Sequence, residues 1–135
     1  MEAKILRKIR ESFGRCTLKK GFYDELLRNL QASGVEAIKG NVSLDSMQQK
    51  QLLKNDIAFL LLAAGDQQAG KIALSRLVTQ SGKSMLNVSS DQFTIWTEAL
   101  ITTVKAFDPR ENAGIESGWR EVIESGFKTI QQHRN

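Results

Sequence analysis

Apolar residues recur every three or four positions through most of this chain. That spacing places apolar side chains along one face of an α-helix, where they can pack against other helices. The chain contains one proline and ten glycines, a composition that favours long helices over many short strands and turns. No segment alternates apolar and polar residues as a half-buried strand does. The sequence therefore predicts an all-α protein.

The predicted helices are separated by glycines, by capping residues and by Asp108-Pro109. They cover residues 2–13, 18–29, 35–39, 45–64, 67–80, 89–107 and 112–130. Gly118 and Gly126 lie beside the apolar stripe of the last helix, where small residues would permit another helix to cross closely. We expect about six to eight helices in a single domain over residues 1–135, a length that buries roughly 70% of the unfolded surface.

Positive charge is concentrated at the N-terminal end. The first 20 residues carry seven basic and two acidic side chains, a net charge of +5, whereas the whole chain carries +4. Such a helix face can contact an acidic protein, an anionic membrane or nucleic acid, or it can simply be solvated. No groove-reading motif or interleaved aromatic residues indicate nucleic acid. We expect a protein partner or a homodimer, with the basic N-terminal helix facing an acidic partner.

The composition also argues against several classes of protein. The longest strongly apolar run, Ile57–Ala64, is much shorter than the roughly 20 residues of a membrane span. The N-terminal residues are charged and do not resemble a signal peptide. A single cysteine, Cys16, excludes an internal disulfide and any cysteine-rich metal motif. These features predict a cytoplasmic protein.

The sequence carries no recognisable catalytic motif. Its only histidine, His133, is two residues from the C-terminal end, so no Ser-His-Asp or Cys-His set can be assembled around it. There is no glycine-rich phosphate loop and no paired-carboxylate pattern. We therefore expect a protein that is not an enzyme.

Four segments occur in the order and spacing of the single-domain globins of bacteria, which the chain resembles over most of its length. They are 22–27 (FYDELL), 48–52 (QQKQL), the region from 86–88 (LNV) through 93–96 (FTIW) to 108–109 (DP), and 118–122 (GWREV). In those globins, such segments belong to the second helix, the helix that crosses over the haem, the loop with the seventh helix, and the final helix. The resemblance implies a globin-like fold.

The resemblance also implies roles for individual residues. Tyr23 falls on the tyrosine that faces bound ligand, and Gln48 falls on the distal position, with Gln49 as the neighbouring alternative. Their hydroxyl and amide groups could donate hydrogen bonds to iron-bound oxygen, or they could be ordinary core and surface groups. Ile38 stands where globins carry a phenylalanine that packs on the haem face. Trp96 is a further candidate cofactor contact, with a role in the core as the alternative.

The histidine that binds haem iron in globins has no counterpart in this sequence. Counting along the helix at 67–80 from its inward-facing leucines places Ser81 at that position, and counting back from Val88 places Lys83 there. A serine hydroxyl is a poor iron ligand. A lysine amine must first lose its proton, which costs free energy unless the site is apolar. Lys83, or a water held by Ser81, is the candidate metal ligand, and we expect no cofactor, with haem as the alternative.

Two functions are compatible with these residues. The first, which we favour, is a globin-like binding or regulatory protein without normal haem ligation, similar in that respect to the haem-free globin domains of some bacterial stress sensors. Bulky residues would then fill the pocket, because large apolar voids are costly. The second is a haem globin with a variant axial ligand that binds oxygen or nitric oxide. Both functions require the same apolar walls, which are predicted at Leu52, Phe59, Leu74, Leu77, Ile95, Ala99 and Thr103.

Overall fold

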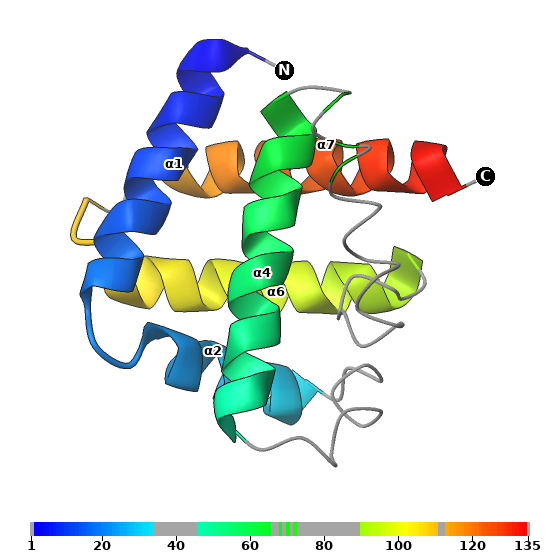
Figure 1. The fold of residues 1–135 in the computed structure, drawn as a ribbon. Coiled ribbons are helices and arrows are strands. Elements are labelled where there is room, and N and C mark those ends of the chain that lie inside the picture. Colours follow the sequence, from blue (N-terminus) through cyan, green and yellow to red (C-terminus); the bar gives the residue numbers. More distant parts are fainter. Residues whose placement is uncertain are drawn as a thin grey trace.

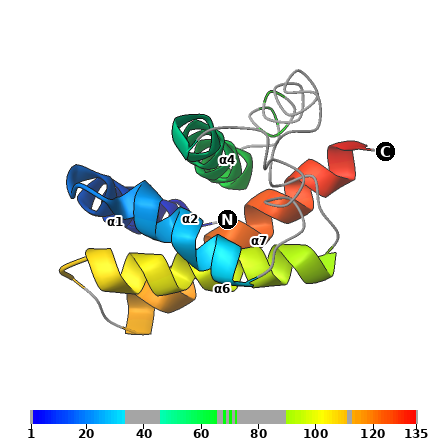
Figure 2. The same ribbon diagram turned by 90° about the horizontal axis from the view of Figure 1, so that it is seen from below.

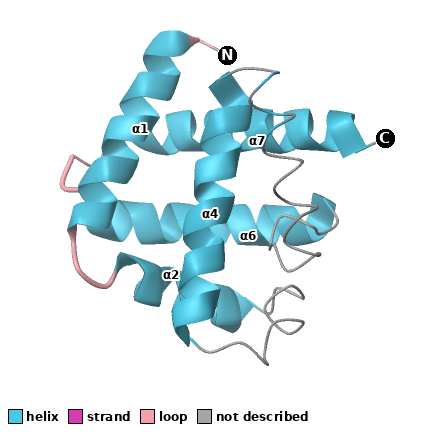
Figure 3. Cartoon of the chain, viewed as in Figure 1, coloured by secondary structure: helices cyan, strands magenta, loops and turns pink. Residues whose placement is uncertain are grey.

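The computed structural model describes residues 2–33, 46–65, 68, 70, 72, 90–110 and 113–134. Its helices, labelled as in Figure 1, are α1 (Ala3–Leu18), α2 (Phe22–Ser33), α4 (Ser46–Gly65), α6 (Ser90–Phe107) and α7 (Ala113–Arg134). Within those ranges every regular element is a helix, and the described connections are loops and turns (Figure 3). The predicted all-α class is therefore confirmed.

The described residues form five helices, whereas the sequence predicted about six to eight. The predicted segment 35–39 lies outside the described residues, and only residues 68, 70 and 72 of the predicted segment 67–80 are described. The other five predicted helices each correspond to one observed helix. In the described part of the chain, no helix is long and apolar enough to cross a membrane.

The helices lie in crossing layers. α1 and α4 cross in front of α6 and α7 (Figure 1), and the view from below places α4 on one side of the molecule and α6 on the other (Figure 2). α4 makes its most extensive contact with α7, α2 packs mainly on α6, and α1 packs mainly on α7. The interior is therefore enclosed by helices that are far apart in the sequence.

α1 is longer than the sequence predicted because it continues through Gly14. Gly14 is exposed, and a Cβ there would meet no atom within 4 Å. Glycine weakens a helix interior by roughly 1 kcal/mol, but Ser12 and Cys16 on either side are fully buried. Their packing outweighs the local cost of the glycine. Gly21, with φ of 94°, then makes the turn, so α2 starts at Phe22, later than predicted.

One hydrophobic core joins all five helices. Its largest fully buried side chains include Trp96, Trp119 and Phe22. At one end of the core the ring centroid of Phe22 lies 5.6 Å from Phe107 and 6.5 Å from Phe13, both edge to face. Aromatic pairs prefer this geometry. The contacts fix the corner where α1, α2 and the end of α6 meet.

Two glycines of α7 let other helices approach its backbone, as the sequence predicted. A Cβ at Gly126 would overlap the carbonyl oxygen of Leu60 in α4 and would lie 3.1 Å from its carbonyl carbon. A Cβ at Gly118 would lie 2.9 Å from Cδ1 of Ile9 in α1. Only the first of these approaches involves main-chain atoms on both sides. α4 and α7 are therefore in direct backbone contact at Gly126.

A buried polar cluster, which we call the Asp108 junction, ties α1 to the end of α6 and to α7. The Asp108 carboxylate accepts hydrogen bonds from Ser12 Oγ at 2.5 Å and from Arg15 Nε and Nη2 at 2.8 Å and 3.0 Å. It also accepts one from the Arg110 amide at 2.9 Å, and Trp119 Nε1 donates to Ser12 Oγ at 2.9 Å. Burial raises the pKa of Asp108, but the hydrogen bonds, chiefly those from Arg15 and Ser12, outweigh it and lower the pKa to about 2.

Candidate functional site

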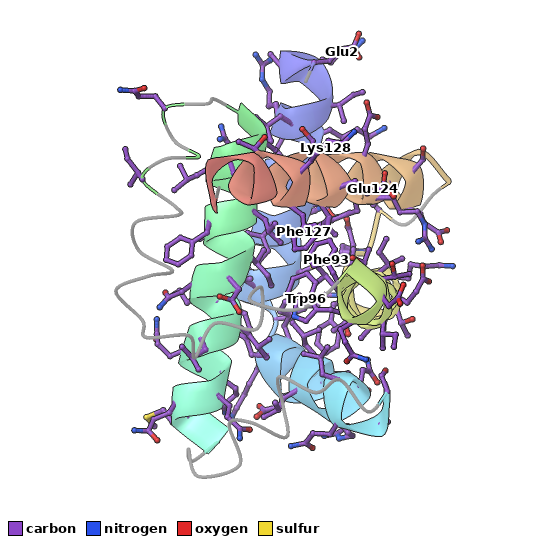
Figure 4. The ribbon with its side chains drawn as sticks, turned by 90° about the vertical axis from the view of Figure 1, so that its right-hand side faces the viewer. Glu2, Phe93, Trp96, Glu124, Phe127 and Lys128 are labelled. Carbon is purple, nitrogen blue, oxygen red and sulfur yellow. The ribbon has the colours of Figure 1, made fainter. Side chains whose placement is uncertain are left out.

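Three aromatic side chains from α6 and α7 form what we call the aromatic stack. The ring of Phe93 lies 5.6 Å from that of Trp96 with an angle of 13° between their planes. It lies 3.7 Å from the ring of Phe127 with an angle of 9°. Phe93 and Trp96 are neighbours because residues three apart share a helix face, and Phe127 reaches them from α7. Figure 4 shows the three side chains gathered between these helices.

Trp96 is the most buried member of the aromatic stack, with an exposed fraction of 0%. Among the described residues, its indole Nε1 has no hydrogen-bond partner. A buried donor without an acceptor costs about 1–3 kcal/mol, and native proteins contain few such groups. This N–H could therefore donate to an acceptor that a ligand brings into the core.

A hollow of about 510 Å³ lies beside the aromatic stack, between α6 and α7. It is lined by Phe93, Thr94, Glu121, Glu124, Ser125, Phe127 and Lys128. The two phenylalanines supply an apolar surface, whereas the three charged side chains are exposed at its edge. Aromatic surface with a few polar groups is the usual lining of a small-molecule site. The α6–α7 hollow can hold a small apolar group whose polar substituents meet the charged edge.

Tyr23 lies at a different end of the core from the aromatic stack. Its ring is 5.2 Å from that of Phe22, and Phe22 packs on Phe107, the last residue of α6. Trp96 is eleven residues earlier in α6, which corresponds to roughly 16 Å along a helix. Burial, and secondarily the nearby Cys16 thiol, raises the pKa of Tyr23 to about 12. Tyr23 therefore packs on Phe22 beside the end of α6.

Gln48 and Gln49 occupy the start of α4, and the structure distinguishes them. Gln48 is exposed, whereas Gln49 has an exposed fraction of only 7%. Three other predicted site residues, Ile38, Ser81 and Lys83, lie outside the described residues. The assignment of an axial ligand to Ser81 or Lys83 therefore stays a prediction.

Several predicted pocket walls contact other helices of the core. Thr103 is fully buried, accepts a hydrogen bond from Asn29 Nδ2 of α2 at 2.9 Å, and donates to the Ala99 carbonyl at 2.8 Å. Phe59 of α4 has an exposed fraction of 4%. This part of α6 is thus covered by α2, and α4 contacts α7 one residue beyond Phe59, at Leu60. The predicted partners Leu74 and Leu77 lie outside the described residues.

Among the described buried side chains, only the Cys16 thiol is of a type that commonly binds haem iron. The buried polar side chains among the described residues are Ser12, Gln49, Asp56, Thr97, Thr103 and Asp108, none of which carries an imidazole. Burial, and secondarily Asp108, raises the pKa of the Cys16 thiol to about 12, which disfavours the thiolate that would bind a metal. No group of three or more His, Cys, Asp and Glu residues in the described part of the chain could hold a metal ion.

The sequence did not identify the aromatic stack or the Asp108 junction as units. Phe93 and Phe127 both belong to the apolar stripes of their helices, but a helical stripe does not specify which side chain in another helix it meets. Asp108 was interpreted only as the end of a helix before proline. The sequence did carry one signal, which was the position of Asp108 at the end of a helix. A carboxylate at a helix end can contact neighbouring helices.

Comparison with known proteins establishes the fold. No family model matches the chain, and no curated protein matches it significantly. A solved structure does match: the crystal structure of protein PA3967 from Pseudomonas aeruginosa PAO1, described as structurally highly homologous to a human hemoglobin. The match has a TM-score of 0.78 and 24% sequence identity, and it covers 96% of this chain and 97% of that chain. The chain therefore has a globin-like fold.

Proposed function

We propose that this protein is a globin-like binding or regulatory module that does not hold haem through a histidine–iron bond. The observation that carries the proposal is the direct contact of α7 with both α6 and α4 in the described interior. Phe93 and Phe127 are in stacking contact between α6 and α7, and the main chains of α4 and α7 touch at Gly126. Close contact of this kind is expected of a core that packs without a planar cofactor.

The position of the only histidine supports the same proposal. His133 is the third residue from the C-terminal end, while the axial positions inferred from sequence carry Ser81 or Lys83. A globin-like fold without its iron ligand can still bind partners through its surfaces. The ligands that we propose are a protein partner, a second copy of the chain, or a small molecule in the α6–α7 hollow. We propose no catalytic reaction, and a cytoplasmic location fits the single cysteine.

A haem globin with a variant axial ligand is the second candidate, and one observation favours it. The Trp96 N–H is fully buried and has no acceptor among the described residues. A ligand in the interior could supply that acceptor. Retention of Tyr23 and Gln48 in the sequence is the other reason to keep this candidate.

Titration of the purified protein with haemin, followed by absorption spectroscopy, tests the proposal. We expect the broad absorption of loosely associated haemin, without a stoichiometric end point. A sharp Soret band that saturates at one haemin per chain would reject the proposal. Loss of that band in Lys83→Ala would then identify Lys83 as the axial ligand.

Two variants test whether only the axial ligand is missing or whether the space for haem is also filled. Ser81→His and Lys83→His each place an imidazole at a position where the sequence predicts the axial ligand. If the interior is filled, neither variant gains a stoichiometric Soret band. A band gained by either variant would show that the space for haem persists and that only the ligand is missing.

A further inference from the structure

A second concave surface, which we call the basic groove, lies where the end of α1, the start of α2 and the start of α4 meet. Its volume is about 360 Å³, and it is open to solvent. The residues that line it are Thr17, Lys19, Lys20, Gly21, Phe22, Tyr23, Asp24, Met47, Lys50, Gln51 and Lys54. Four lysines face one aspartate, so the lining carries a net charge of +3.

Part of this charge is already neutralised within the chain. Lys50 Nζ lies 2.8 Å from Asp24 Oδ1, and this hydrogen bond lowers the pKa of Asp24, which keeps the carboxylate charged. Lys19, Lys20 and Lys54 are exposed and form no ion pair with any described residue. Three ammonium groups on two sides of the groove are therefore available to an external anion.

The backbone holds these lysines in place. Gly21 adopts φ of 94°, a conformation that glycine tolerates and other residues rarely adopt. The resulting turn carries Lys19 and Lys20 to the start of α2, opposite Lys54 on α4. The N-terminal end of α2 adds the partial positive charge of its free amide groups.

Apolar side chains accompany the positive charge. Leu18, between two residues of the groove, has an exposed fraction of 87%, and Met47, which lines the groove, has one of 78%. Tyr23 adds a half-buried ring. Large exposed apolar side chains beside a rim of like charge are typical of a protein-binding surface.

We propose that the basic groove binds an acidic, amphipathic segment of a partner protein. Its carboxylates would contact Lys19, Lys20 and Lys54, and an apolar side chain would cover Met47. This inference rests on the proposed binding role and names the chemistry of the partner. A concave surface formed by three helices suits a protruding segment better than a flat membrane, and the single half-buried ring offers little stacking surface for nucleic acid.

The test is fluorescence anisotropy with a labelled, amphipathic peptide rich in Glu and Leu. Combined substitution of Lys19→Gln, Lys20→Gln and Lys54→Gln is expected to weaken peptide binding about tenfold, because each exposed charge pair contributes modestly. Binding by the unaltered protein should weaken as salt is raised. Circular dichroism establishes that each variant is folded.

A matched control removes the same number of charges elsewhere on α1. Lys4, Arg7 and Lys8 are exposed and do not line the groove, so Lys4→Gln, Arg7→Gln and Lys8→Gln together should change affinity less than about twofold. Equal losses in the two triple variants would overturn the proposal, because binding would then follow net charge alone. Failure of the unaltered protein to bind the peptide would also overturn it.

A further variant and two other classes of ligand give additional outcomes in the same assay. Met47→Ser should weaken peptide binding, since it removes an exposed apolar contact without changing charge. Tighter binding to anionic phospholipid vesicles or to single-stranded DNA than to the peptide would overturn the proposal in favour of those ligands.

The haemin titration is interpreted separately from peptide binding. A Soret band together with groove-dependent peptide binding would reject the haem-free role and retain the groove.

Discussion

The core contains two tryptophans that are almost equally buried. Among the described residues, the indole nitrogen of only one of them has a hydrogen-bond partner. Trp119 at the Asp108 junction has an exposed fraction of 1%, and its Nε1 donates to Ser12. Trp96 in the aromatic stack has an exposed fraction of 0%, and its Nε1 has no partner among the described residues. The Asp108 junction therefore uses its indole donor within the protein, whereas the aromatic stack contains a donor without an acceptor among the described residues. A donor of that kind is what a ligand can exploit.

Removal of the carboxylate at the Asp108 junction should have the largest effect. Asp108→Ala leaves the Arg15 guanidinium and the Ser12 hydroxyl without their shared acceptor. We expect a loss of about 4 kcal/mol in the free energy of unfolding, in the range for breaking a buried charge pair. Urea unfolding measures it. A loss below about 1 kcal/mol would mean that the junction does not dominate stability and would remove the contrast between the two regions.

The next largest effect is expected at the crossing beside the aromatic stack. Gly126→Ala places a Cβ against the main chain of Leu60, so α4 and α7 must separate. The expected destabilisation is about 3 kcal/mol. Gly14→Ala is the matched control, since a Cβ there meets nothing within 4 Å and should stabilise α1 by about 0.5–1 kcal/mol. Similar effects of the two variants would contradict the backbone contact.

Acid should weaken the Asp108 junction. The pKa of Asp108 is lowered from 3.8 to about 2 in the folded protein, so folding favours the charged carboxylate. Its contribution, about 2 kcal/mol, is complete above the unfolded pKa and is lost as the pH falls from about 4 to about 2. Unfolding free energies measured across this range should fall more steeply for the unaltered protein than for Asp108→Asn. Equal pH dependence of the unfolding free energy in the two proteins would show that Asp108 does not cause the loss of stability in acid.

The smallest effects are expected for substitutions of the two tryptophans, which can be compared directly. Trp119→Phe removes a hydrogen bond as well as ring volume and should cost about 2 kcal/mol. Trp96→Phe removes an unsatisfied donor together with similar volume, so its cost should stay below about 1 kcal/mol. Thermal unfolding of both variants measures the difference. A larger cost for Trp96→Phe would indicate that its N–H has an acceptor in the folded protein.

The sequence predicted the helices well because their apolar stripes and end signals are local. α6 ends at Phe107, immediately before the predicted stop at Asp108-Pro109. α1 was predicted too short because the burial of Cys16 depends on contacts made much later in the chain, including the carbonyl of Val104 at 4.0 Å. A single sequence carries no sign of such distant pairings.

The candidate site was less predictable for the same reason. Tyr23 and Trp96 both fall on motifs of the globin resemblance, but their places in the core depend on helix rotations that a motif does not specify. The Ser12–Asp108 and Ser12–Trp119 hydrogen bonds join residues 96 and 107 positions apart. The basic groove likewise combines residues from three helices, of which the sequence indicated only the charged end of the first.

The long separations within the Asp108 junction have a consequence during synthesis. Ser12 is made long before its hydrogen-bond partners, because its acceptor Asp108 and its donor Trp119 follow it by 96 and 107 positions. α1 therefore cannot dock in its final position while the rest of the chain is still being translated. A chain that grows from its N-terminal end tends to fold early segments first, yet the hydrogen bonds that fix Ser12 of α1 require residues of the later helices. The basic side chains of α1 can therefore meet other molecules on the nascent chain until these partners have been made.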